Sequence, residues 1–579
     1  MLVKKSNKNE TLIYGTILFF FSTIYNQYFG NIGVFPIDSF AIFNSGYDII
    51  NGYFPFKDYW TITGPFIDLT QSFLFKIFGL SWFTYVLHAS LFNFLISITT
   101  FLVLKKFNLN INYCFLYAFL TSMLAYPSAG TPYVDQHSAI LSIICIYVFI
   151  LGVKTDFNIY WFLLPIVLGI SFLSKQTPTG YIFIIICVLS LIYFITYFNL
   201  ANLLIGIGTG LSFLLFFFLI LKLNEISLSS FIEQYLLYPM IIGKSRIENF
   251  LLPLEFQRII LRHKWIHLSM LILIIVLFKN LTTNINYIIK KEFIIISALI
   301  ATGYALIVHQ LMTVNGLFIF FLIPIMGGFS HVYWDKYYSN RKRSLILMIS
   351  LIVIISFYYQ YKYIFSRNFL GLTHNDIQNS VSAETFDKKL KGLKWITYLH
   401  PSNPNDEINK LKNAINIIKE DTRKKSIISD YQFISVILNI YDFAPSKYWY
   451  HYHVYPSKNQ KFFKVYRNFF ISKLKEKLSQ VITKDTFDKQ ILLKDQLKNK
   501  SGQYVNKNNI SNFTQEKVKK QSLKIKKIKS KDGKKRLKYS LKVNMLPSHL
   551  DKRVERYKDE IFKQSERFGI DPAMVFAII

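Results

Sequence analysis

The pattern of hydrophobic and polar positions divides the chain near residue 365. Before that point, long apolar runs follow one another with short polar stretches between them. An apolar run of about 18 residues or more can cross the roughly 30 Å hydrocarbon core of a bilayer, and backbone in lipid must be helical to satisfy its own hydrogen bonds. We therefore expect about eleven membrane-spanning helices. They lie near residues 11–29, 82–104, 111–127, 136–153, 158–174, 178–199, 201–221, 265–280, 292–312, 314–333 and 344–365.

A shorter apolar stretch, 64–79, contains Asp68 and Lys76. Charged residues are costly inside a bilayer, so we expect a helix at the membrane interface, with a twelfth span as the alternative. The first apolar segment has no small-residue cleavage site, which favours a retained helix over a signal peptide.

Lysine and arginine at the helix ends predict the orientation. With the leader "MLVKKSNKNE" in the cytoplasm, the other cytoplasmic loops hold "KKF" at 105–107, Lys154, "KK" at 290–291 and "NRKR" at 340–343. The outer loops are then 30–81, 127–135, 175–177, 222–264 and a turn near 312. An odd number of spans places everything after residue 365 outside the cytoplasm.

The composition agrees with a division of the chain into an apolar part and a basic part. The 579 residues are 52% hydrophobic and yet carry a formal net charge of +33, which one soluble globule cannot accommodate. The three cysteines lie inside apolar runs and give neither a disulfide framework nor a metal-binding spacing.

The first outer loop, "NIGVFPIDSFAIFNSGYDIINGYFPFKDYWTITGPF" at 31–66, combines carboxylates with aromatic residues. A carboxylate so close to lipid is costly unless it has a function. The alternative for Asp38 is a solvated loop residue or the N-cap of a short helix at 39–51.

Three further motifs share the predicted outer face: "NGYFPFKDYW" with "TGPF" at 51–66, "TPYVDQHSAIL" at 131–141 and "LGISFLSKQTPTGYIF" at 168–183. The order of these motifs makes residues 10–365 resemble a known family. It is the polytopic glycosyltransferases of the GT-C fold, near the protein mannosyltransferase, lipid A aminoarabinose transferase and RgtA/B/C/D-like group. The resemblance implies a mainly α, polytopic fold. It also implies sugar transfer from a polyprenyl-phosphate donor to an envelope lipid, polysaccharide or protein acceptor, at the periplasmic face of a bacterial inner membrane.

Such a transfer needs a base for the acceptor hydroxyl and cations for the departing phosphate. Asp38 matches the catalytic Asp of the family, as the base or as a carboxylate that supports a metal. A divalent ion, Mg²⁺ or Mn²⁺, is the one cofactor that the resemblance allows. Asp58 is a candidate second catalytic carboxylate, and its alternative is a turn-forming role.

Substrate-binding candidates come from the other outer loops. Lys175 is expected to contact phosphate, and a lysine that extends from a helix end toward water is the alternative. Asp135 is a further candidate, although we favour an N-cap role for a helix that starts near Gln136.

His137 is a candidate substrate contact, but a lone histidine one turn into a helix is more often satisfied by a neighbour. Lys244 and Arg246 are candidates for the donor phosphate, with solvated loop charges as the equal alternative. His88 and His309 are expected to be hydrogen-bonded core residues.

Beyond the apolar runs, residues 366–480 predict a small α/β appendage outside the membrane. "EINKLKNAINIIKE" has the apolar spacing of a helix, while "KSIISD" and "FISVILNIYD" indicate short strands.

Residues 481–579 are basic. Nucleic acid is an improbable partner on an outer face. "VITKDTFDKQILLKDQLKNKSGQ" and "LKYSLKVNMLPSHLDKRVERYKDEIFKQSERFGIDPAMVFAII" resemble parts of the membrane-bound lytic murein transglycosylase C family: the end of its N-terminal domain, the linker and the first helices of its lysozyme-like domain. This resemblance implies contact with peptidoglycan. The family's catalytic Glu follows these helices, and this sequence stops at Ile579, so we expect the module to be inactive as given.

A truncated or misjoined reading frame is the favoured explanation, and the front part of a fusion of two envelope enzymes is the other. Two other functions stay open for the whole chain. One is a fragment of a lytic transglycosylase that cleaves peptidoglycan. The other is an O-antigen flippase or polymerase, for which charged or Gly/Pro-broken helices at mid-membrane are typical.

Overall fold

A computed structural model describes residues 8–252, 255–420, 427, 429–441, 445–447, 454–456, 460–479, 523–529 and 535–541. The chain divides into two compact units, Met1–Lys477 and Leu478–Ile579.

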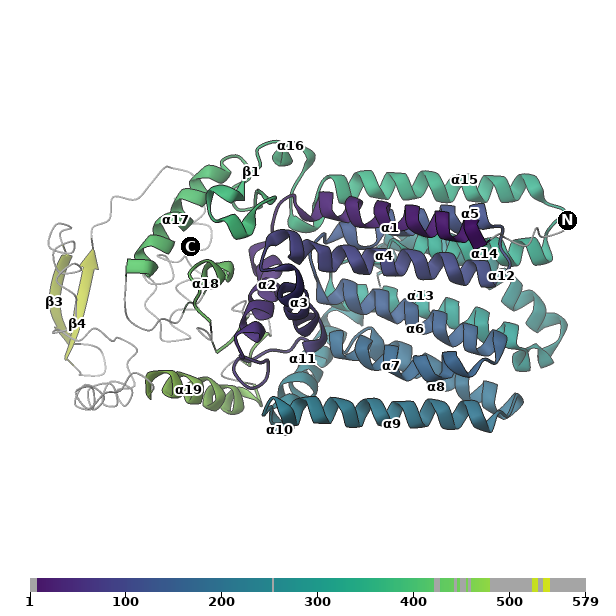
Figure 1. The fold of residues 1–579 in the computed structure, drawn as a ribbon, viewed down its shortest axis with the longest axis horizontal. Coiled ribbons are helices and arrows are strands. Elements are labelled where there is room, and N and C mark those ends of the chain that lie inside the picture. Colours follow the sequence, from purple (N-terminus) through teal and green to yellow (C-terminus); the bar gives the residue numbers. More distant parts are fainter. Residues whose placement is uncertain are drawn as a thin grey trace. The chain divides into compact units, whose positions relative to one another are not determined.

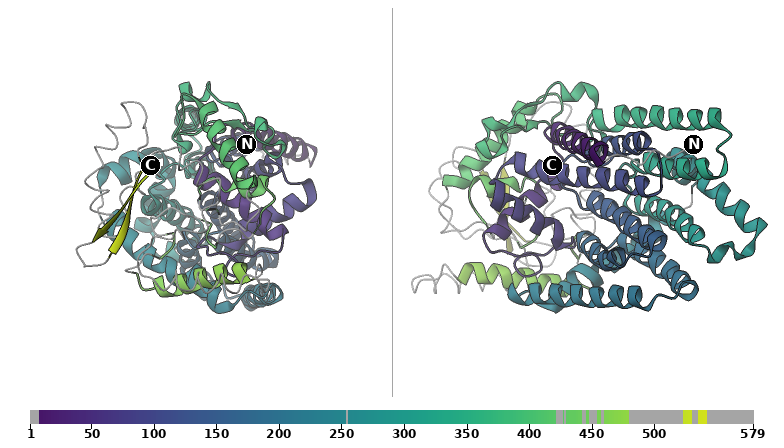
Figure 2. Two further views of the ribbon diagram at one scale, coloured as in Figure 1. Left: turned by 90° about the vertical axis from the view of Figure 1, so that its left-hand side faces the viewer. Right: turned by 45° about the vertical axis from the view of Figure 1, so that its right-hand side comes forward.

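A bundle of long helices running side by side forms most of the first unit (Figures 1 and 2). Each stretch predicted to span the membrane contains a long helix, but the helix in the stretch 314–333 begins only at Leu322. The helices are α1 (Lys8–Gly30), α4 (Trp82–Lys106), α5 (Ile111–Leu124), α6 (Val134–Thr155), α7 (Asn158–Ser174), α8 (Thr179–Thr196), α9 (Leu200–Leu223), α12 (Arg262–Thr283), α13 (Lys291–Thr313), α14 (Leu322–Tyr337) and α15 (Lys342–Tyr359).

Length and hydropathy decide which of these helices can cross a bilayer alone. Seven of the described helices are long and apolar enough. They are Trp82–Lys106, Val134–Thr155, Thr179–Thr196, Leu200–Leu223, Gln257–Thr283, Lys291–Thr313 and Lys342–Leu370. The chain is therefore a mainly helical, multi-pass membrane protein, while the number of eleven crossings stays a prediction.

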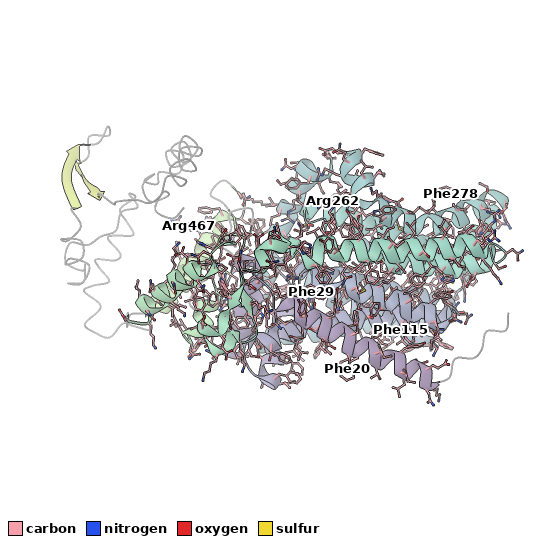
Figure 3. The ribbon with its side chains drawn as sticks, turned by 90° about the horizontal axis from the view of Figure 1, so that it is seen from above. Phe20, Phe29, Phe115, Arg262, Phe278 and Arg467 are labelled. Atoms are coloured by element: carbon pink, nitrogen blue, oxygen red, sulfur yellow. The ribbon has the colours of Figure 1, made fainter. Side chains whose placement is uncertain are left out.

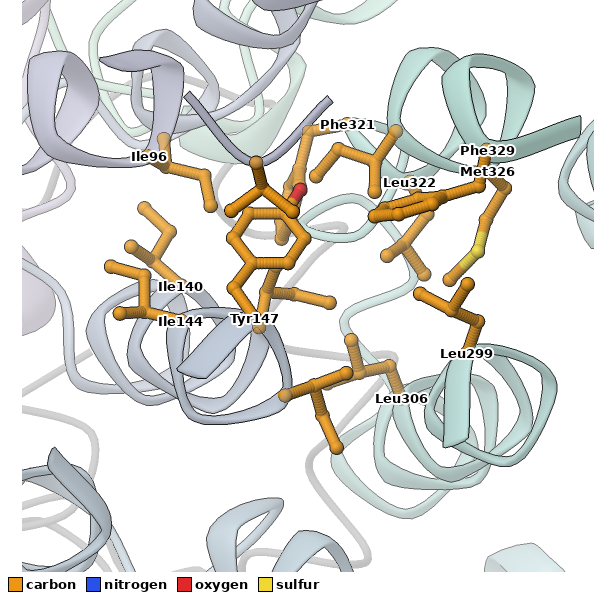
Figure 4. Close-up of a cluster of buried hydrophobic side chains, with 14 of the residues drawn as sticks. Ile96, Ile140, Ile144, Tyr147, Leu299, Leu306, Phe321, Leu322, Met326 and Phe329 are labelled. Carbon is orange, nitrogen blue, oxygen red and sulfur yellow. The ribbon is translucent and has the colours of Figure 1, made fainter. Parts of the chain in front are cut away.

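The bundle buries its core between α4, α6, α13 and α14, where Ile96, Ile140, Leu299 and Phe329 meet (Figure 4). The outer surface is also apolar. Leu215 of α9, for example, is 70% exposed. Apolar side chains that face outward suit a helix surrounded by lipid.

Short helices gather at one end of the bundle, and the N-terminus lies at the other (Figure 1). They are α2 (Pro36–Ile50), α3 (Pro65–Phe78), α10 (Leu228–Phe231) and α11 (Tyr238–Arg246). The predicted interface helix is α3, and its 14 residues span only about 21 Å, too short for a crossing.

Basic residues predicted to be cytoplasmic gather at the N-terminal end. Lys105 donates a hydrogen bond to Thr11, and the Lys154 ammonium lies 4.3 Å from the centre of the Phe107 ring. Figure 3 shows how far this end is from the other, since Arg262 and Phe278 mark opposite ends of α12.

The appendage after the bundle contains α16 (His374–Ile377), β1 (Val381–Ser382), β2 (Lys394–Trp395), α17 (Pro404–Glu420), α18 (Phe433–Ile437) and α19 (Phe463–Ser479). The predicted helix at "EINKLKNAINIIKE" is confirmed as α17. Within the described part of the appendage, the named strands are β1 and β2, a two-residue antiparallel pair. The described appendage thus combines helices with one short strand pair, which lies outside the two stretches predicted as strands.

The stretch "FISVI", predicted as a strand, is helix α18. Phe433, Ile434 and Val436 are buried there against the start of α2 and the appendage core. A short apolar run does not distinguish a strand from a buried helix, so tertiary packing decided the outcome. Most of "KSIISD" lies outside the described residues.

The second unit contains an antiparallel pair of strands, β3 (Leu523–Lys529) and β4 (Lys535–Leu541), with Leu523 opposite Leu541. Both stretches that resemble lytic transglycosylases fall almost wholly outside the described residues.

Candidate functional site

Asp135 is the centre of a polar cluster at the end of the bundle that carries α2 and α3. Its carboxylate forms an ion pair with Lys175. It also accepts hydrogen bonds from His309 Nε2 at 3.1 Å and from Asn315 Nδ2 at 2.9 Å. The predicted N-cap role of Asp135 is wrong, because α6 begins at Val134, its N-cap position is Tyr133 and no side chain caps it.

Lys175 lies directly after α7, in a turn that several elements hold in place. Gln176 donates to the carbonyls of Ile62 and Tyr235. Gly64 of the "TGPF" motif approaches so closely that a Cβ there would lie 1.8 Å from the carbonyl oxygen of Leu173. The structure thus brings two of the sequence motifs together, and the glycine permits the contact.

Burial lowers the pKa of Lys175 from its ordinary value, and the Arg246 guanidinium lowers that pKa further. Asp135 and Asp38 act in the opposite direction. These opposing influences show that both carboxylates and Arg246 lie near one ammonium group. The Lys175 side chain is only 17% exposed, so its charge is poorly screened by water.

Asp38 lies in the first turn of α2, which begins at Pro36 after the N-cap residue Phe35. The N-cap alternative for Asp38 is therefore wrong. No residue in the described part of the chain donates a hydrogen bond to its carboxylate. Burial raises the pKa of Asp38 to about 7, Asp135 raises it as well, and Lys175 opposes both. A carboxylate with a pKa near neutrality can accept a proton at physiological pH.

The two predicted phosphate contacts of the 222–264 loop, Lys244 and Arg246, lie in different surroundings. Arg246, half-buried at the end of α11, influences both Lys175 and His309. No ion pair of Arg246 with another described residue is present. Lys244, two residues before Arg246 on the same helix, is exposed.

The two remaining candidates lie in other environments. Asp58 accepts a hydrogen bond from the Phe54 backbone N–H at 2.8 Å and pairs with Lys473 at 3.5 Å. His137 is fully buried, with its Nε2 3.0 Å from that of His88 and its Nδ1 bonded to Tyr126. Their substrate roles stay predictions, and the described geometry is that of structural residues.

Sequence reasoning missed three contributors. His309 is buried and hydrogen-bonded as predicted, but its partner is Asp135, a contact that the sequence did not indicate. Asn315 follows Val314, which has the left-handed φ of +60° at the end of α13. Arg367 is 1% exposed and donates to the carbonyls of Ile32, Pro127 and Ala129 at 2.7–3.0 Å. It therefore ties the start of the α2 loop to the loop before α6, the two segments that carry Asp38 and Asp135.

We expect Arg367→Ala to destabilise the protein strongly. Three buried carbonyls would lose their donor, and each buried unsatisfied group costs about 1–3 kcal/mol. The measurement is thermal unfolding of the purified chain in lipid nanodiscs, with the exposed Arg341→Ala as the matched control. Equal melting temperatures for the two variants would contradict the role of Arg367.

A divalent ion needs several oxygen or nitrogen ligands around it. Within the described residues, no group of three or more His, Cys, Asp or Glu side chains could hold a metal ion. The Asp135 carboxylate is already taken by three donors, one of them a cation. The metal was expected at Asp38 rather than Asp135, and it stays a prediction.

Comparisons with known proteins give two similarities. No protein-family model matches the chain. Over 41 residues, 7% of this chain, it is 42% identical to the membrane-bound lytic murein transglycosylase C of Edwardsiella ictaluri, and the match covers 11% of that protein. This local match confirms the transglycosylase resemblance for a short segment only.

The solved structure of the Archaeoglobus fulgidus oligosaccharyltransferase, tethered to an acceptor peptide with the NVT sequon, aligns at a TM-score of 0.40 and 12% identity. The alignment covers 76% of this chain and 64% of that one. One similarity is short and the other distant, so a function must be inferred from the geometry of the site.

Proposed function

We propose that the chain is an integral-membrane glycosyltransferase. It transfers a sugar from a polyprenyl-phosphate donor to an envelope lipid, polysaccharide or protein acceptor. The observation that carries the proposal is the arrangement at one end of the bundle. There, Asp135 and Lys175 form a buried ion pair, and the charges of Asp38 and Arg246 both influence Lys175. No described residue pairs with the Asp38 carboxylate.

Asp38 acts as the general base in this mechanism. It removes the proton from the acceptor hydroxyl, whose oxygen then forms a bond to the anomeric carbon of the donor sugar. The bond between that carbon and the phosphate oxygen breaks, and the lipid phosphate leaves. The pKa of about 7 lets Asp38 hold and release this proton near neutral pH.

Lys175 and Arg246 supply the positive charge for the departing phosphate. Fixed charges aimed at a developing anion are worth more in a partly buried site than in water. Asp135 is a positioning residue, because it orients Lys175 while His309 and Asn315 hold its carboxylate. No step requires a metal ion.

An apolar cavity beside this cluster suits the lipid part of the donor. It has a volume of about 760 Å³ and lies between α3, α7 and α9, with Phe66, Leu173 and Phe217 in its lining. Leu173 is two residues from Lys175, so a prenyl chain in the cavity would bring its phosphate close to the ammonium group.

The direct test reconstitutes the full chain in liposomes with polyprenyl-phosphate donors that carry radiolabelled sugars and with an envelope extract as acceptor. Label moves from the lipid phosphate to the extract if the proposal holds. Absence of transfer with every donor, together with absence of donor hydrolysis, would overturn it.

We also propose that the protein resides in a bacterial inner membrane with a cytoplasmic N-terminus and a periplasmic appendage. A reporter active only in the periplasm, fused after Tyr450, is then expected to be active. The same reporter fused after Phe107 is the control and should be silent. Silence at both positions would mean that one crossing was missed, and the opposite pattern would mean that the whole orientation is inverted.

A second function is favoured only by the local match to the lytic transglycosylase. It would place the C-terminal unit near peptidoglycan. A flippase or polymerase is less consistent with the site, since Asp38, Asp135 and Lys175 gather at a bundle end rather than at mid-membrane.

A further inference from the structure

One segment of the appendage docks against the start of α2, where Asp38 lies. The Phe433 ring is 4.6 Å from that of Phe40, centre to centre. Two residues further along, Ser435 accepts a hydrogen bond from Asn44. These contacts place the start of α18 against the first half of α2, and Asp430 lies three residues before Phe433.

Asp430 is exposed and no described residue forms an ion pair with it. Its charge raises the pKa of Asp38, in agreement with the packing of the two segments. The neighbouring Tyr431 is fixed, because its hydroxyl donates to Glu407 Oε1 at 2.6 Å and its ring stacks on Trp395. The backbone that carries Asp430 is thus anchored while its side chain faces solvent.

An exposed aromatic ring lies at the same place. Tyr398 is 44% exposed, and its ring stacks on Phe35 with 5.0 Å between centres and 19° between planes. Phe35 is three residues before Asp38. The Val34 backbone N–H also donates to the Ile396 carbonyl at 3.0 Å, which joins the two segments. Asp430 is next to Tyr431, whose ring stacks on Trp395, three residues before Tyr398, so the two exposed side chains come from segments that pack together.

We propose that Tyr398 and Asp430 form the acceptor subsite and that the acceptor is a neutral saccharide. This inference rests on the proposed glycosyltransferase function. An exposed aromatic face packs against the apolar C–H face of a sugar ring, and a carboxylate accepts hydrogen bonds from its hydroxyls. Because Asp38 and Asp430 are both acidic, they repel an anionic acceptor. The cations Lys175 and Arg246 serve the donor phosphate instead.

Binding of glycans to the full chain in nanodiscs tests the subsite without any donor. The probes are neutral hexose and N-acetylhexosamine oligosaccharides, the same chain lengths with uronic acids, and an unglycosylated peptide. We expect neutral glycans to bind, and Asp430→Ala and Tyr398→Ala each to weaken binding about tenfold or more. Tyr398→Phe keeps the ring and should retain binding.

The effect of the Asp430 charge can be measured separately. Asp430→Asn removes the repulsion, so it should improve binding of the uronic-acid probe relative to the neutral one, which a merely structural residue would not do. Tyr441→Ala and Glu384→Gln are matched controls. Tyr441 packs on Tyr53 beyond the far end of α2, and Glu384 is an exposed appendage carboxylate.

Four results would overturn the inference: preference for the peptide or the acidic glycans, no glycan binding, binding unchanged in both alanine variants, or binding abolished by a chelator. The last would make the paired carboxylates a cation site. Failure of the proposed function is a separate result, because neutral glycans would then bind while no sugar leaves the lipid donor.

Discussion

Asp38→Asn is expected to lower the rate of sugar transfer by about 10²–10⁴-fold, the usual contribution of a general base, while membrane insertion is unchanged. Asparagine keeps the size of the side chain but cannot accept the acceptor proton. The measurement is turnover in liposomes at saturating donor. Glu384→Gln, which changes an exposed carboxylate of the appendage, is the control. Wild-type turnover in Asp38→Asn would show that Asp38 is not the general base.

The pH profile gives the same prediction a second readout. The base must be deprotonated, so kcat/KM should rise with pH through about 7, the pKa of Asp38. Asp135 raises this pKa, so Asp135→Asn should move the rise to lower pH. A rise centred near pH 4 would show that another carboxylate is the base.

Stability should change with pH in the opposite sense to activity. The folded-state pKa of Asp38 is raised from 3.8 to about 7, so the folded state favours the protonated form. The stability that this form contributes is full below about pH 4 and is lost as the pH rises through about 7. Asp38→Asn should therefore gain melting temperature relative to wild type at pH 8, and less at pH 5.

The helices of the bundle were predictable because the bilayer requires long apolar helices. The residues at which the helices begin were less predictable. Asp38 and Asp135 were both considered as N-caps from residue type alone. In the structure both helices start earlier, at Pro36 and Val134, so each carboxylate falls in the first turn. Its partners then come from other helices, which local sequence rules do not describe.

The composition of the candidate site was only partly predictable. Asp38, Asp135 and Lys175 lie in loops whose motifs drew attention, and the structure places them together. His309 and Arg367 have polar neighbours, Gln310 in one case and Ser366 and Asn368 in the other, and nothing in these short stretches distinguishes a site residue from a core residue. Their roles depend on contacts that span 174 positions to Asp135 and 335 to Ile32.

Lys175→Ala is expected to lower kcat/KM for the donor by about 10²–10³-fold, the usual cost of losing a group that stabilises a transition-state anion. The KM of the acceptor should change little, because Asp430 and Tyr398 belong to another part of the surface. Lys57→Ala is the matched control, since Lys57 is an outer-loop lysine paired with Glu225. Equal loss with both substrates would instead indicate a structural role.

The ion pair between Lys175 and Asp135 allows a second test of the role of Lys175. Removing Lys175 alone leaves the Asp135 carboxylate buried, 3% exposed, without its cation. Breaking one side of a buried pair is costly, and the leftover charge would also repel the donor phosphate. The double variant Lys175→Ala with Asp135→Asn should therefore use the donor better than Lys175→Ala does. Such a rescue is the nonadditivity expected of residues in contact. A double variant no better than Lys175→Ala would mean that Asp135 contacts the substrate itself, rather than positioning the lysine that does.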